Sequence, residues 1–369
     1  MSTQIRAHVI TEPQGTFQLQ EGLEIQDPAP GEVLVRYTST GLCHTDLFAR
    51  DVMHQPDSAP AIYGHEGTGV VEQVGEGVLE FAPGDRVSAS YASCGTCPNC
   101  LRGAPFHCLS FNDVNFASTR PDGTHKVSKD GEPVGASFFG QSSFATHGLV
   151  NARDLVKVPD WVTPEDAYLL GPLGCGVQTG AGAVLNVLKP APSDSIVVSG
   201  VGAVGISALM AAAASNVGTI IAVDLLDSRL ELAKELGATH VINGGSGDAA
   251  AQVQEITGGG ATHAFDTTGV PPVLQALVEG LAWGGKLGIV GARPEQMLDL
   301  MPVMQFGRSV IGIVEGQSVP RVFIPQLLEL RRQGLFPLER IVTTYRFDEL
   351  EKAIEDTESG ASLKAVLVH

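Results

Sequence analysis

The pattern of apolar and polar residues divides the chain into two halves of different character. In the first half, short stretches such as 32–38 and 70–74 have the pattern of strands, and glycine or proline turns separate them. In the second half, short apolar runs rich in β-branched residues alternate with helical patterns. Strands and helices that alternate in this way build a parallel sheet, so the second half predicts a doubly wound α/β domain. The first half predicts a strand-rich barrel or sandwich.

The expected elements set the borders of the domains. Strands are predicted at 195–199, 219–223, 264–268, 286–290 and 310–314, and helices at 206–214, 227–236 and 272–281. A helix at 327–333 and a final strand at 363–368 follow, and we expect this tail to rejoin the first domain. The predicted division is a first domain at 1–176, a second domain at 177–318 and a C-terminal return to the first domain at 319–369.

Composition narrows the possible functions. At about 150 residues per domain, the 369 residues suggest two domains, and 43% hydrophobic residues are ample for two cores. The net charge of −18 argues against a nucleic-acid partner or an anionic membrane surface, because both need a basic face. The first residues lack the apolar core of a signal peptide, and no apolar run reaches the ~18 residues of a membrane span. We therefore expect a cytoplasmic enzyme, in which the six cysteines serve metal binding or catalysis rather than disulfides.

Four cysteines follow one another at the spacing C-x2-C-x2-C-x7-C: Cys94, Cys97, Cys100 and Cys108. Four thiolates this close together can complete a tetrahedral zinc site without an open position, and such a site stabilises a loop without taking part in a reaction. Two disulfides or four free thiols are the alternatives. We favour structural zinc because cysteines separated by two residues are strained as a disulfide and well placed for chelation.

Three further candidate ligands are spread widely along the chain: Cys43, His65 and Cys175. Two thiolates and one neutral imidazole are the ligands of a catalytic zinc with an open fourth position, whose Lewis acidity makes an alcohol easier to deprotonate. Taken singly, Cys43 is typical of a buried thiol and His65 of a core histidine. The neighbouring glycines and the cofactor motif that follows favour the shared metal site.

Three neighbours of these ligands complete the predicted catalytic site. Asp46 is expected to accept a hydrogen bond from the second ring nitrogen of His65 and so to fix its tautomer. Glu66 borders the metal and can approach it when the open site rearranges. Thr45 offers a hydroxyl group that can pass the substrate proton outward.

A dinucleotide motif opens the second domain. A β-branched strand at 195–199 leads into a glycine-rich loop and a helix, and the next strand ends at Asp224, 19 residues after Gly205. This order is typical of a Rossmann domain, in which the loop approaches the pyrophosphate and the acidic residue binds the ribose. The carboxylate favours NAD over NADP, although Arg229 is near it in the sequence, and a turn residue is the alternative for Asp224. The predicted cofactor site comprises Gly200, Val201, Gly202, Ala203, Val204, Gly205, Asp224 and Arg229, with Val290, Gly291 and Ala292 near the nicotinamide.

These motifs resemble those of the zinc-dependent alcohol dehydrogenases of the medium-chain dehydrogenase/reductase superfamily, over essentially the whole chain. The stretch from Gly64 to Val78 is similar to the family's zinc signature, and the four-cysteine spacing is similar to its structural-zinc lobe. Residues 140–146 and 171–182 look most like those of aryl-alcohol (benzyl-alcohol) dehydrogenases. The resemblance implies an α/β architecture with a GroES-like, β-rich catalytic domain and a Rossmann domain. It also implies NAD and two zinc ions per subunit as cofactors.

The resemblance further implies roles for individual residues. His44 and Lys364 would contact the cofactor pyrophosphate, Thr179 would lie by the nicotinamide, and Thr45 would contact the alcohol oxygen. Many family members have a histidine five residues after the first zinc cysteine, which completes the proton relay, but this chain has Phe48 there. We therefore expect another proton route, such as water, and a more apolar pocket.

The predicted function is the reversible oxidation of an apolar primary alcohol, aromatic and of the benzyl-alcohol type, to its aldehyde with NAD+. A terpenoid, allylic or aliphatic alcohol dehydrogenase is the alternative within the family. A catalytically silent protein that binds NAD and zinc is a remote alternative, and the complete ligand set argues against it. The resemblance also implies a homodimer or homotetramer, with a small-molecule alcohol or aldehyde as its only other partner.

Overall fold

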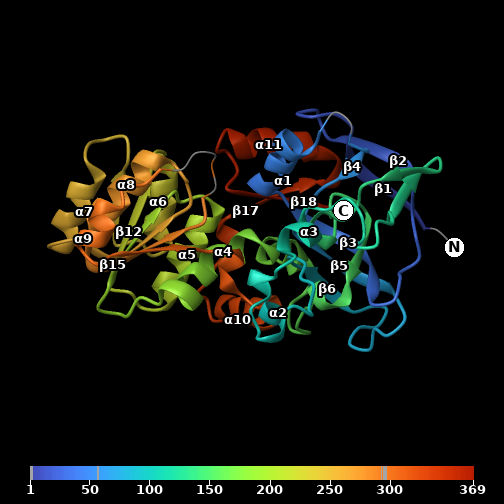
Figure 1. Cartoon of the computed structure of the whole chain (residues 1–369), viewed down its shortest axis with the longest axis horizontal. Coiled ribbons are helices and arrows are strands. Elements are labelled where there is room, and N and C mark those ends of the chain that lie inside the picture. The colour runs from blue at the N-terminus through green and yellow to red at the C-terminus, as the bar shows by residue number, and fades with distance from the viewer. Residues whose placement is uncertain (1–2, 56–57, 292, 294–296) are drawn as a thin grey trace. The chain divides into compact units, whose positions relative to one another are not determined.

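The structure is a computed structural model that describes residues 3–55, 58–291, 293 and 297–369. The chain forms two compact units, and Figure 1 labels many of their elements. The first unit contains Met1–Cys175, Val319–Gln326 and Leu338–His369, and the second contains Gly176–Ser318 and Leu327–Pro337. The expected division assigns all of 319–369 to the first domain, whereas residues 327–337 pack with the second unit.

The first unit is built around two β-sheets. In one sheet the strands are ordered β4 (Ala61–Ile62), β1 (Thr3–Ile10), β2 (Gln18–Ile25), β7 (Val127–Lys129) and β8 (Glu132–Val134). In the other they are ordered β10 (Leu155–Lys157), β6 (Arg86–Ala89), β5 (Gly67–Val74), β3 (Glu32–Gly41), β18 (Lys364–Val368) and β17 (Val342–Arg346), and β9 (His147–Asn151) also pairs with β3. The helices of this unit include α1 (His44–Phe48), α2 (Pro98–Leu101), α3 (Phe111–Asn115) and α11 (Leu350–Glu358).

Strand β3 lies at the centre of the first unit because it contributes to two cores. Val33, Val35 and Tyr37 pack into one apolar cluster, whereas Leu34 packs into another. The sequence predicts a half-buried strand here, but most of its side chains are buried, because neighbouring strands pair with it and apolar clusters cover both of its faces. The last strand of the chain, β18, pairs antiparallel with β3 next to Gly41.

The second unit contains one parallel sheet. Its strands are ordered β13 (His240–Asn243), β12 (Thr219–Asp224), β11 (Ser195–Ser199), β14 (Ala261–Asp266), β15 (Leu281–Ile289) and β16 (Ser309–Gly312). Its helices are α4 (Gly176–Gly182), α5 (Ala203–Ala214), α6 (Asp227–Glu235), α7 (Ala249–Thr257), α8 (Pro271–Gly280) and α9 (Met301–Gln305), and α10 (Pro320–Arg332) contributes residues to both units. Counted along the chain, the strand order is 3-2-1-4-5-6, which is that of a dinucleotide-binding Rossmann domain. The predicted doubly wound sheet is therefore confirmed.

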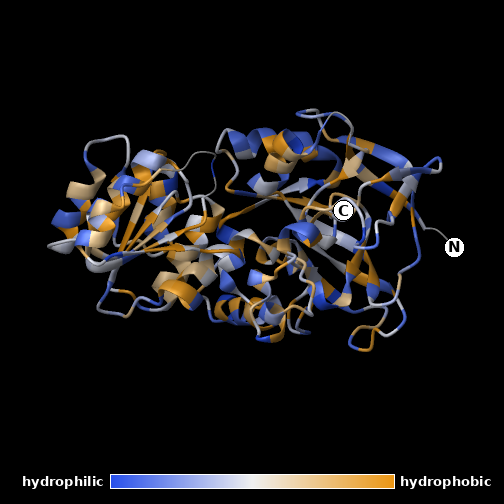
Figure 2. Cartoon of the chain, in the orientation of Figure 1, coloured by the Kyte–Doolittle hydropathy of each residue, from blue (hydrophilic) through white to orange (hydrophobic). Residues whose placement is uncertain are grey.

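The central strands of this sheet are apolar along most of their length, as their orange colour in Figure 2 shows. Strand β11 has the sequence Ser-Ile-Val-Val-Ser, and all of its residues are buried. Parallel strands that helices cover on both faces have this composition, because no side of the strand faces water. Within the described part of the chain, no helix is both long enough and apolar enough to cross a membrane.

Strand β14 ends earlier than the sequence predicts, at Asp266 instead of Thr268. The polar side chains of Asp266 and of Thr267, which follows the strand, bind nearby groups. The Asp266 carboxylate accepts a hydrogen bond from the Gly269 N–H at 2.7 Å, and the Thr267 hydroxyl donates to the Gly200 carbonyl at 2.8 Å. The end of β14 therefore forms a turn that contacts the glycine-rich loop.

Candidate metal centre and cofactor site

The structure brings the widely spaced ligands of the predicted open metal site together in the first unit. One atom from each of Cys43, His65, Glu66 and Cys175 can serve as a ligand, and these four atoms all lie within 4.8 Å of one another. Cys43 is half-buried and the other three residues are buried. This spacing is short enough for a single cation to contact several of the four groups.

One buried carboxylate holds two of these ligands in place. Asp46 Oδ2 accepts a hydrogen bond from the Cys43 N–H (2.9 Å), while Oδ1 accepts one from the Gly64 N–H (3.1 Å) and lies 2.7 Å from His65 Nδ1. An imidazole that donates from Nδ1 keeps the lone pair of Nε2 for a metal. His65 Nε2 is buried and has no hydrogen-bond partner among the residues that the structure describes, as expected for an atom that ligates a metal.

Close backbone contacts bring Cys175 to the other ligands. A Cβ atom on Gly171 would lie 2.4 Å from the Glu66 carbonyl oxygen, and one on Gly174 would lie 2.3 Å from the Ala89 carbonyl oxygen. A side chain at either position would push the segment away, so glycine is required at both. The two glycines that precede Cys175 therefore reflect this close approach.

The charges around the ligands favour metal binding. A hydrogen bond with Cys175 lowers the pKa of the Cys43 thiol well below its usual value, against the effect of burial. Burial alone would lower the pKa of His65, but the Asp46 carboxylate raises it well above its ordinary value and makes the ring a more basic ligand. Thiolates and basic imidazoles are donors that zinc prefers, so this donor set fits zinc.

A buried ion pair lies behind the open site. Lys364 Nζ is 2.5 Å from Glu66 Oε2 and donates a hydrogen bond to the Leu42 carbonyl at 2.8 Å. Burial raises the pKa of Glu66 to about 7, although Lys364 acts in the opposite direction. The family resemblance places Lys364 at the cofactor pyrophosphate, whereas the structure buries its ammonium group against Glu66. The charge of Lys364 therefore compensates the carboxylate that adjoins the metal ligands.

Helix α1 carries the predicted site residues His44 and Thr45 and also Phe48, in different surroundings. Thr45 Oγ1 lies 3.7 Å from Cys43 Sγ, so its hydroxyl group reaches the metal cluster. His44 is exposed, and Phe48 has 49% of its surface exposed. Because a phenyl group cannot accept a proton, a proton that reaches Thr45 cannot continue through Phe48.

Three phenylalanines form an aromatic wall (Phe116, Phe138 and Phe139) beside the metal cluster. The Phe139 ring centre lies 4.5 Å from that of the His65 imidazole at 32°, and Phe138 approaches the imidazole edge-on at 5.6 Å and 86°. Phe116 lies 6.1 Å from Phe138 and 5.4 Å from Phe139. From the sequence alone, Phe138, Phe139 and Phe144 are more typical of a core than of ligand contacts, although so aromatic a loop can also line an apolar pocket. The structure buries Phe138 and Phe139 while placing them against a metal ligand.

Gln141 is a residue of this site that the sequence does not indicate. Its Nε2 donates a hydrogen bond to the His65 carbonyl at 2.9 Å, and its Oε1 accepts one from the Gly67 N–H at 3.0 Å. These contacts join positions that are 76 and 74 residues apart, so no local motif reveals them. Gln141 stands among serines and phenylalanines in the stretch 137–144, so nothing in its neighbourhood singles it out.

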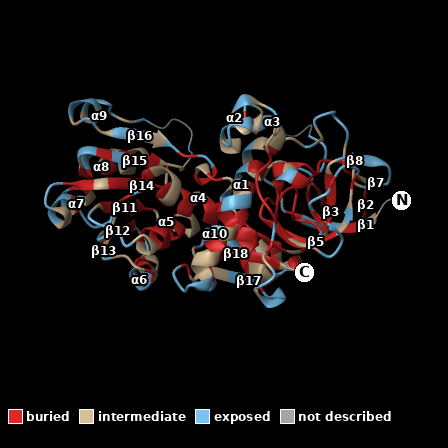
Figure 3. Cartoon of the chain, turned by 90° about the horizontal axis from the view of Figure 1, so that it is seen from below, coloured by how far each residue is buried: buried red, intermediate tan, exposed pale blue. Residues whose placement is uncertain are grey.

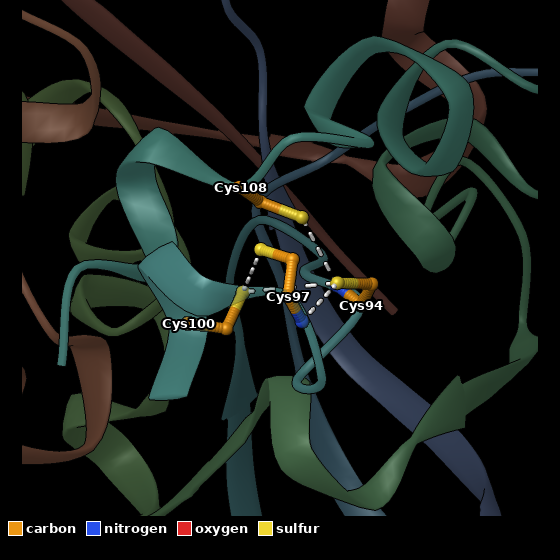
Figure 4. Close-up of side chains that lie close together, drawn as sticks. All are labelled: Cys94, Cys97, Cys100 and Cys108. Atoms are coloured by element: carbon orange, nitrogen blue, oxygen red, sulfur yellow. Dashed lines mark hydrogen bonds between the residues drawn. The ribbon is translucent and has the colours of Figure 1, made fainter. Parts of the chain in front are cut away.

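The second metal cluster is closed. Figure 4 shows Cys94, Cys97, Cys100 and Cys108 converging, and their sulfur atoms all lie within 4.8 Å of one another. The sulfurs of Cys97 and Cys100 are 3.5 Å apart and those of Cys94 and Cys100 are 3.9 Å apart. Sulfurs at about 2.3 Å from a tetrahedral zinc are roughly 3.8 Å apart. These four cysteines form no disulfide, so the geometry supports the predicted structural zinc site over the two alternatives.

The glycine-rich loop of the second unit has the geometry of a dinucleotide site. Gly200 has a φ of +77°, and a Cβ atom on Gly205 would lie 1.9 Å from the Gly200 carbonyl oxygen. The Val201 N–H donates to Asp224 Oδ2 at 2.8 Å, and Arg229 Nη1 lies 3.9 Å from the same oxygen. Asp224 therefore lies beside the loop at the end of β12, where a ribose-binding carboxylate is expected.

The remaining residues of the predicted cofactor site lie on three elements. Gly202 precedes α5, Ala203 and Val204 begin it, Thr179 lies in α4, and Val290 and Gly291 follow β15, while Ala292 lies outside the described residues. Thr267 is a further residue that the sequence does not indicate. Its hydroxyl donates to the carbonyls of Gly200 (2.8 Å) and Ser199 (3.1 Å), and so it helps to hold the glycine-rich loop.

Both halves of the chain match known families. Residues 29–160 match the alcohol dehydrogenase GroES-like domain, and residues 203–331 match the zinc-binding dehydrogenase domain. The geraniol dehydrogenase of Castellaniella defragrans is 43% identical over 358 residues, which cover 94% of this chain and 93% of that protein.

Solved structures agree with these matches. An alcohol dehydrogenase zinc-binding domain protein from Burkholderia ambifaria is 43% identical, with a TM-score of 0.95 over 100% of this chain and 99% of that one. The benzyl alcohol dehydrogenase of Acinetobacter calcoaceticus is 44% identical, with a TM-score of 0.93 over 99% of each chain. From these similarities and its two zinc sites, the chain belongs to the zinc-dependent, NAD-linked alcohol dehydrogenases of the medium-chain dehydrogenase/reductase superfamily.

Proposed function

We propose that this alcohol dehydrogenase oxidises an apolar primary alcohol of the aromatic, benzyl-alcohol type to its aldehyde, reversibly and with NAD+. The dehydrogenase activity follows from the family, so the proposal concerns the alcohol. The main observation behind it is the aromatic wall, whose Phe138 and Phe139 rings lie against the metal ligand His65. The similar benzyl alcohol dehydrogenase from Acinetobacter calcoaceticus, 44% identical, supports the same substrate class.

The residues of the first unit have separate roles in metal binding and proton transfer. When bound, zinc supplies Lewis acidity to the alcohol oxygen and NAD+ accepts the hydride. Cys43, His65 and Cys175 hold the metal. Thr45 accepts the alcohol proton at Oγ1 and passes it to water, because Phe48 offers no group that takes it further. The alcohol thus loses one proton and one hydride and becomes the aldehyde.

A panel of alcohols tests the aromatic preference. We expect kcat/KM for benzyl alcohol to exceed that for hexan-1-ol by about 10- to 200-fold, because a difference of apolar contact is worth roughly 1–3 kcal/mol in a hydrophobic pocket. The measurement follows NADH absorbance at fixed NAD+. Equal or higher values for hexan-1-ol would show that the aromatic wall does not select the substrate.

Geraniol is the second candidate, because the geraniol dehydrogenase of Castellaniella defragrans is 43% identical to this chain. Geraniol is an allylic alcohol with a flexible chain, so it depends less on ring stacking than benzyl alcohol does. In a Phe139→Leu variant, we expect kcat/KM to fall more for benzyl alcohol than for geraniol. Phe81→Leu, in the other core cluster of the first unit, is the matched control. If kcat/KM of the wild-type enzyme is higher for geraniol than for benzyl alcohol, geraniol is the better candidate substrate.

A Phe48→His variant tests the proton route. Residues 45 and 48 lie on one face of α1, so an imidazole at 48, with an ordinary pKa of about 6.5, can take the proton from Thr45. We expect the profile of kcat for alcohol oxidation to move to lower pH. Val52→His instead places a histidine at an exposed position four residues further on and serves as the control. If the two variants and the wild type share one pH profile, the relay is not interrupted at Phe48.

We also propose that the protein is a homodimer that forms through strand β16. This strand is the edge of the parallel sheet, and Figure 3 shows it and α9 in the colours of intermediate and exposed residues. Exposed apolar side chains occur on β16 and on the segments next to it in the sequence and sheet: Trp283 on β15, Met301 and Met304 on α9, Val310 on β16, and Val314 just after it. An edge strand with such a surface is suited to pairing with a second copy. Sedimentation should give a dimer for the wild type and a monomer for Val310→Lys, and a monomeric wild type would refute the proposal.

A cytoplasmic location is part of the same proposal. The cysteines gather in two ligand clusters rather than in disulfides, which is typical of proteins from reducing compartments.

A further inference from the structure

The segment that carries the aromatic wall has an unusual backbone. Phe139 and Ser142 have φ values of +48°, and Gly140 between them has a φ of +70°. Residues with a side chain rarely adopt this left-handed conformation, and each costs roughly 1–3 kcal/mol unless the surroundings hold it. Residues 138–142, called here the left-handed turn, therefore require groups that hold them in place.

The left-handed turn encloses the metal ligand His65. Phe139 lies against the imidazole ring at 4.5 Å, and Phe138 meets it edge-on at 5.6 Å. Gln141 binds the backbone on both sides of this residue, at the His65 carbonyl and the Gly67 N–H. Asp46 binds the imidazole at Nδ1, while Nε2 has no hydrogen-bond partner among the described residues.

A buried lysine also binds the left-handed turn, through the Gly140 carbonyl. Lys126 is 5% exposed, and its Nζ donates hydrogen bonds to the Gly140 carbonyl at 3.0 Å and the Leu149 carbonyl at 2.8 Å. Leu149 belongs to β9, which pairs with the central strand β3. The ammonium group therefore connects the turn to the sheet of the first unit.

Burying the charged ammonium group of Lys126 costs free energy, which is unusual for a residue with a purely structural role. Burial lowers the pKa of Lys126 to about 8; Glu32 and Asp154 favour its charge, and Arg120 opposes it. Glu32 is also bound by Arg120 through two hydrogen bonds of 2.8 and 3.0 Å. Lysine is rarely buried to this extent. A protein with an apolar residue at such a position is often at least as stable as one with a buried charge.

We propose that Lys126 is a positioning residue of the metal site, which holds the Gly140 carbonyl and so keeps Phe139 and Gln141 against His65. Without it, the left-handed turn relaxes and the imidazole loses its restraint. The proposal rests on the role of His65 as a zinc ligand and does not depend on which alcohol is the substrate.

The test compares Lys126→Met with a matched control, Lys129→Met. Lys129 is the last residue of β7. Its Nζ donates a hydrogen bond to Gln20 Oε1 at 2.8 Å and not to a residue of the turn. For Lys126→Met we expect zinc to be lost from the open site to a chelator about tenfold faster, since groups behind a ligand typically change metal affinity 10- to 100-fold. The absorption bands of the cobalt-substituted enzyme should shift, and kcat should fall about tenfold while KM for NAD+ stays constant. Lys129→Met should behave as the wild type.

A double-mutant cycle with Phe139→Leu tests whether Lys126 acts through the turn. We expect the double variant to lose zinc no faster than the faster of the two single variants, because residues that act through one element are not additive. Additive effects of the two substitutions on the rate of zinc loss would contradict the proposal. A Lys126→Met variant that melts at a lower temperature but keeps the zinc-loss rate and cobalt spectrum of the wild type would also contradict it. If Lys126→Met does not fold, Lys126→Gln replaces it. If neither folds, Lys126 is needed for the whole unit and the proposal is wrong.

Discussion

Replacing Cys43 with alanine abolishes alcohol oxidation while leaving NAD+ binding nearly unchanged. Cys43 is one of the four groups that gather within 4.8 Å in the first unit, whereas the glycine-rich loop and Asp224 lie in the second. Loss of a thiolate ligand removes the Lewis acid, whose contribution of several kcal/mol corresponds to a loss of ~10³-fold or more in kcat. The measurements are NADH formation at saturating alcohol and NAD+ binding by calorimetry.

The same variant should keep one zinc ion per chain, because the Cys94, Cys97, Cys100 and Cys108 cluster shares no ligand with the open site. A variant that retains both zinc ions and full turnover would show that Cys43 is not a ligand. Loss of NAD+ binding together with retained metal would contradict the division of labour between the two units.

An Asp46→Asn substitution weakens the open site almost as severely. The two carboxylate oxygens of Asp46 accept from the Cys43 and Gly64 N–H groups and face His65 Nδ1. An amide has only one oxygen, so its NH2 group must face a donor, and the hydrogen bond that fixes the imidazole tautomer or the one that holds Cys43 is lost. We expect kcat/KM and zinc affinity to fall about 10- to 100-fold, as is typical for the carboxylate behind a metal-bound histidine.

The control for this substitution is Asp51→Asn, in the next turn of the chain. Asp51 forms a partly buried ion pair with Arg50 at 2.6 Å, and among the described residues no hydrogen bond joins it to a ligand. Its variant should retain wild-type zinc content and kcat/KM. Equal effects of the two substitutions would mean that Asp46 acts through general stability and not through His65 and Cys43.

Both metal clusters and the cofactor fold could be predicted because their residues are chemically distinctive and regularly spaced. The four-cysteine spacing admits few other interpretations, and the order of strand, glycines, helix, strand and Asp224 describes a single supersecondary unit. Cys43, His65 and Cys175 are far apart in the sequence, and the glycines beside them were the signal that their backbones approach closely.

The residues that support the site could not be predicted because their contacts span long distances along the chain. Gln141 reaches His65 across 76 residues, Thr267 reaches Gly200 across 67, and Lys126 binds ordinary backbone carbonyls. Lys364 was linked to the cofactor by resemblance, but β18 pairs next to Gly41 and brings its side chain to Glu66. Such pairings depend on the register of strands that no local pattern specifies.

Helix α10 shows a different reason for a missed boundary. The sequence predicts its start at 327, two residues after Pro325. Proline inside a helix removes a hydrogen bond and carries a local penalty. The structure begins the helix at Pro320 and keeps Pro325 within it. The apolar side chains of Phe323 and Ile324 are buried, so packing outweighs the local penalty of the proline.

Anomalous diffraction at the zinc edge, from a crystal of the purified protein, tests the shared metal site most directly. We predict one peak among the four closely spaced cysteines and a second peak within bonding distance of Cys43 Sγ, His65 Nε2 and Cys175 Sγ. A crystal that shows the first peak but no density at the second position, in protein that oxidises alcohols with NAD+, would contradict the account.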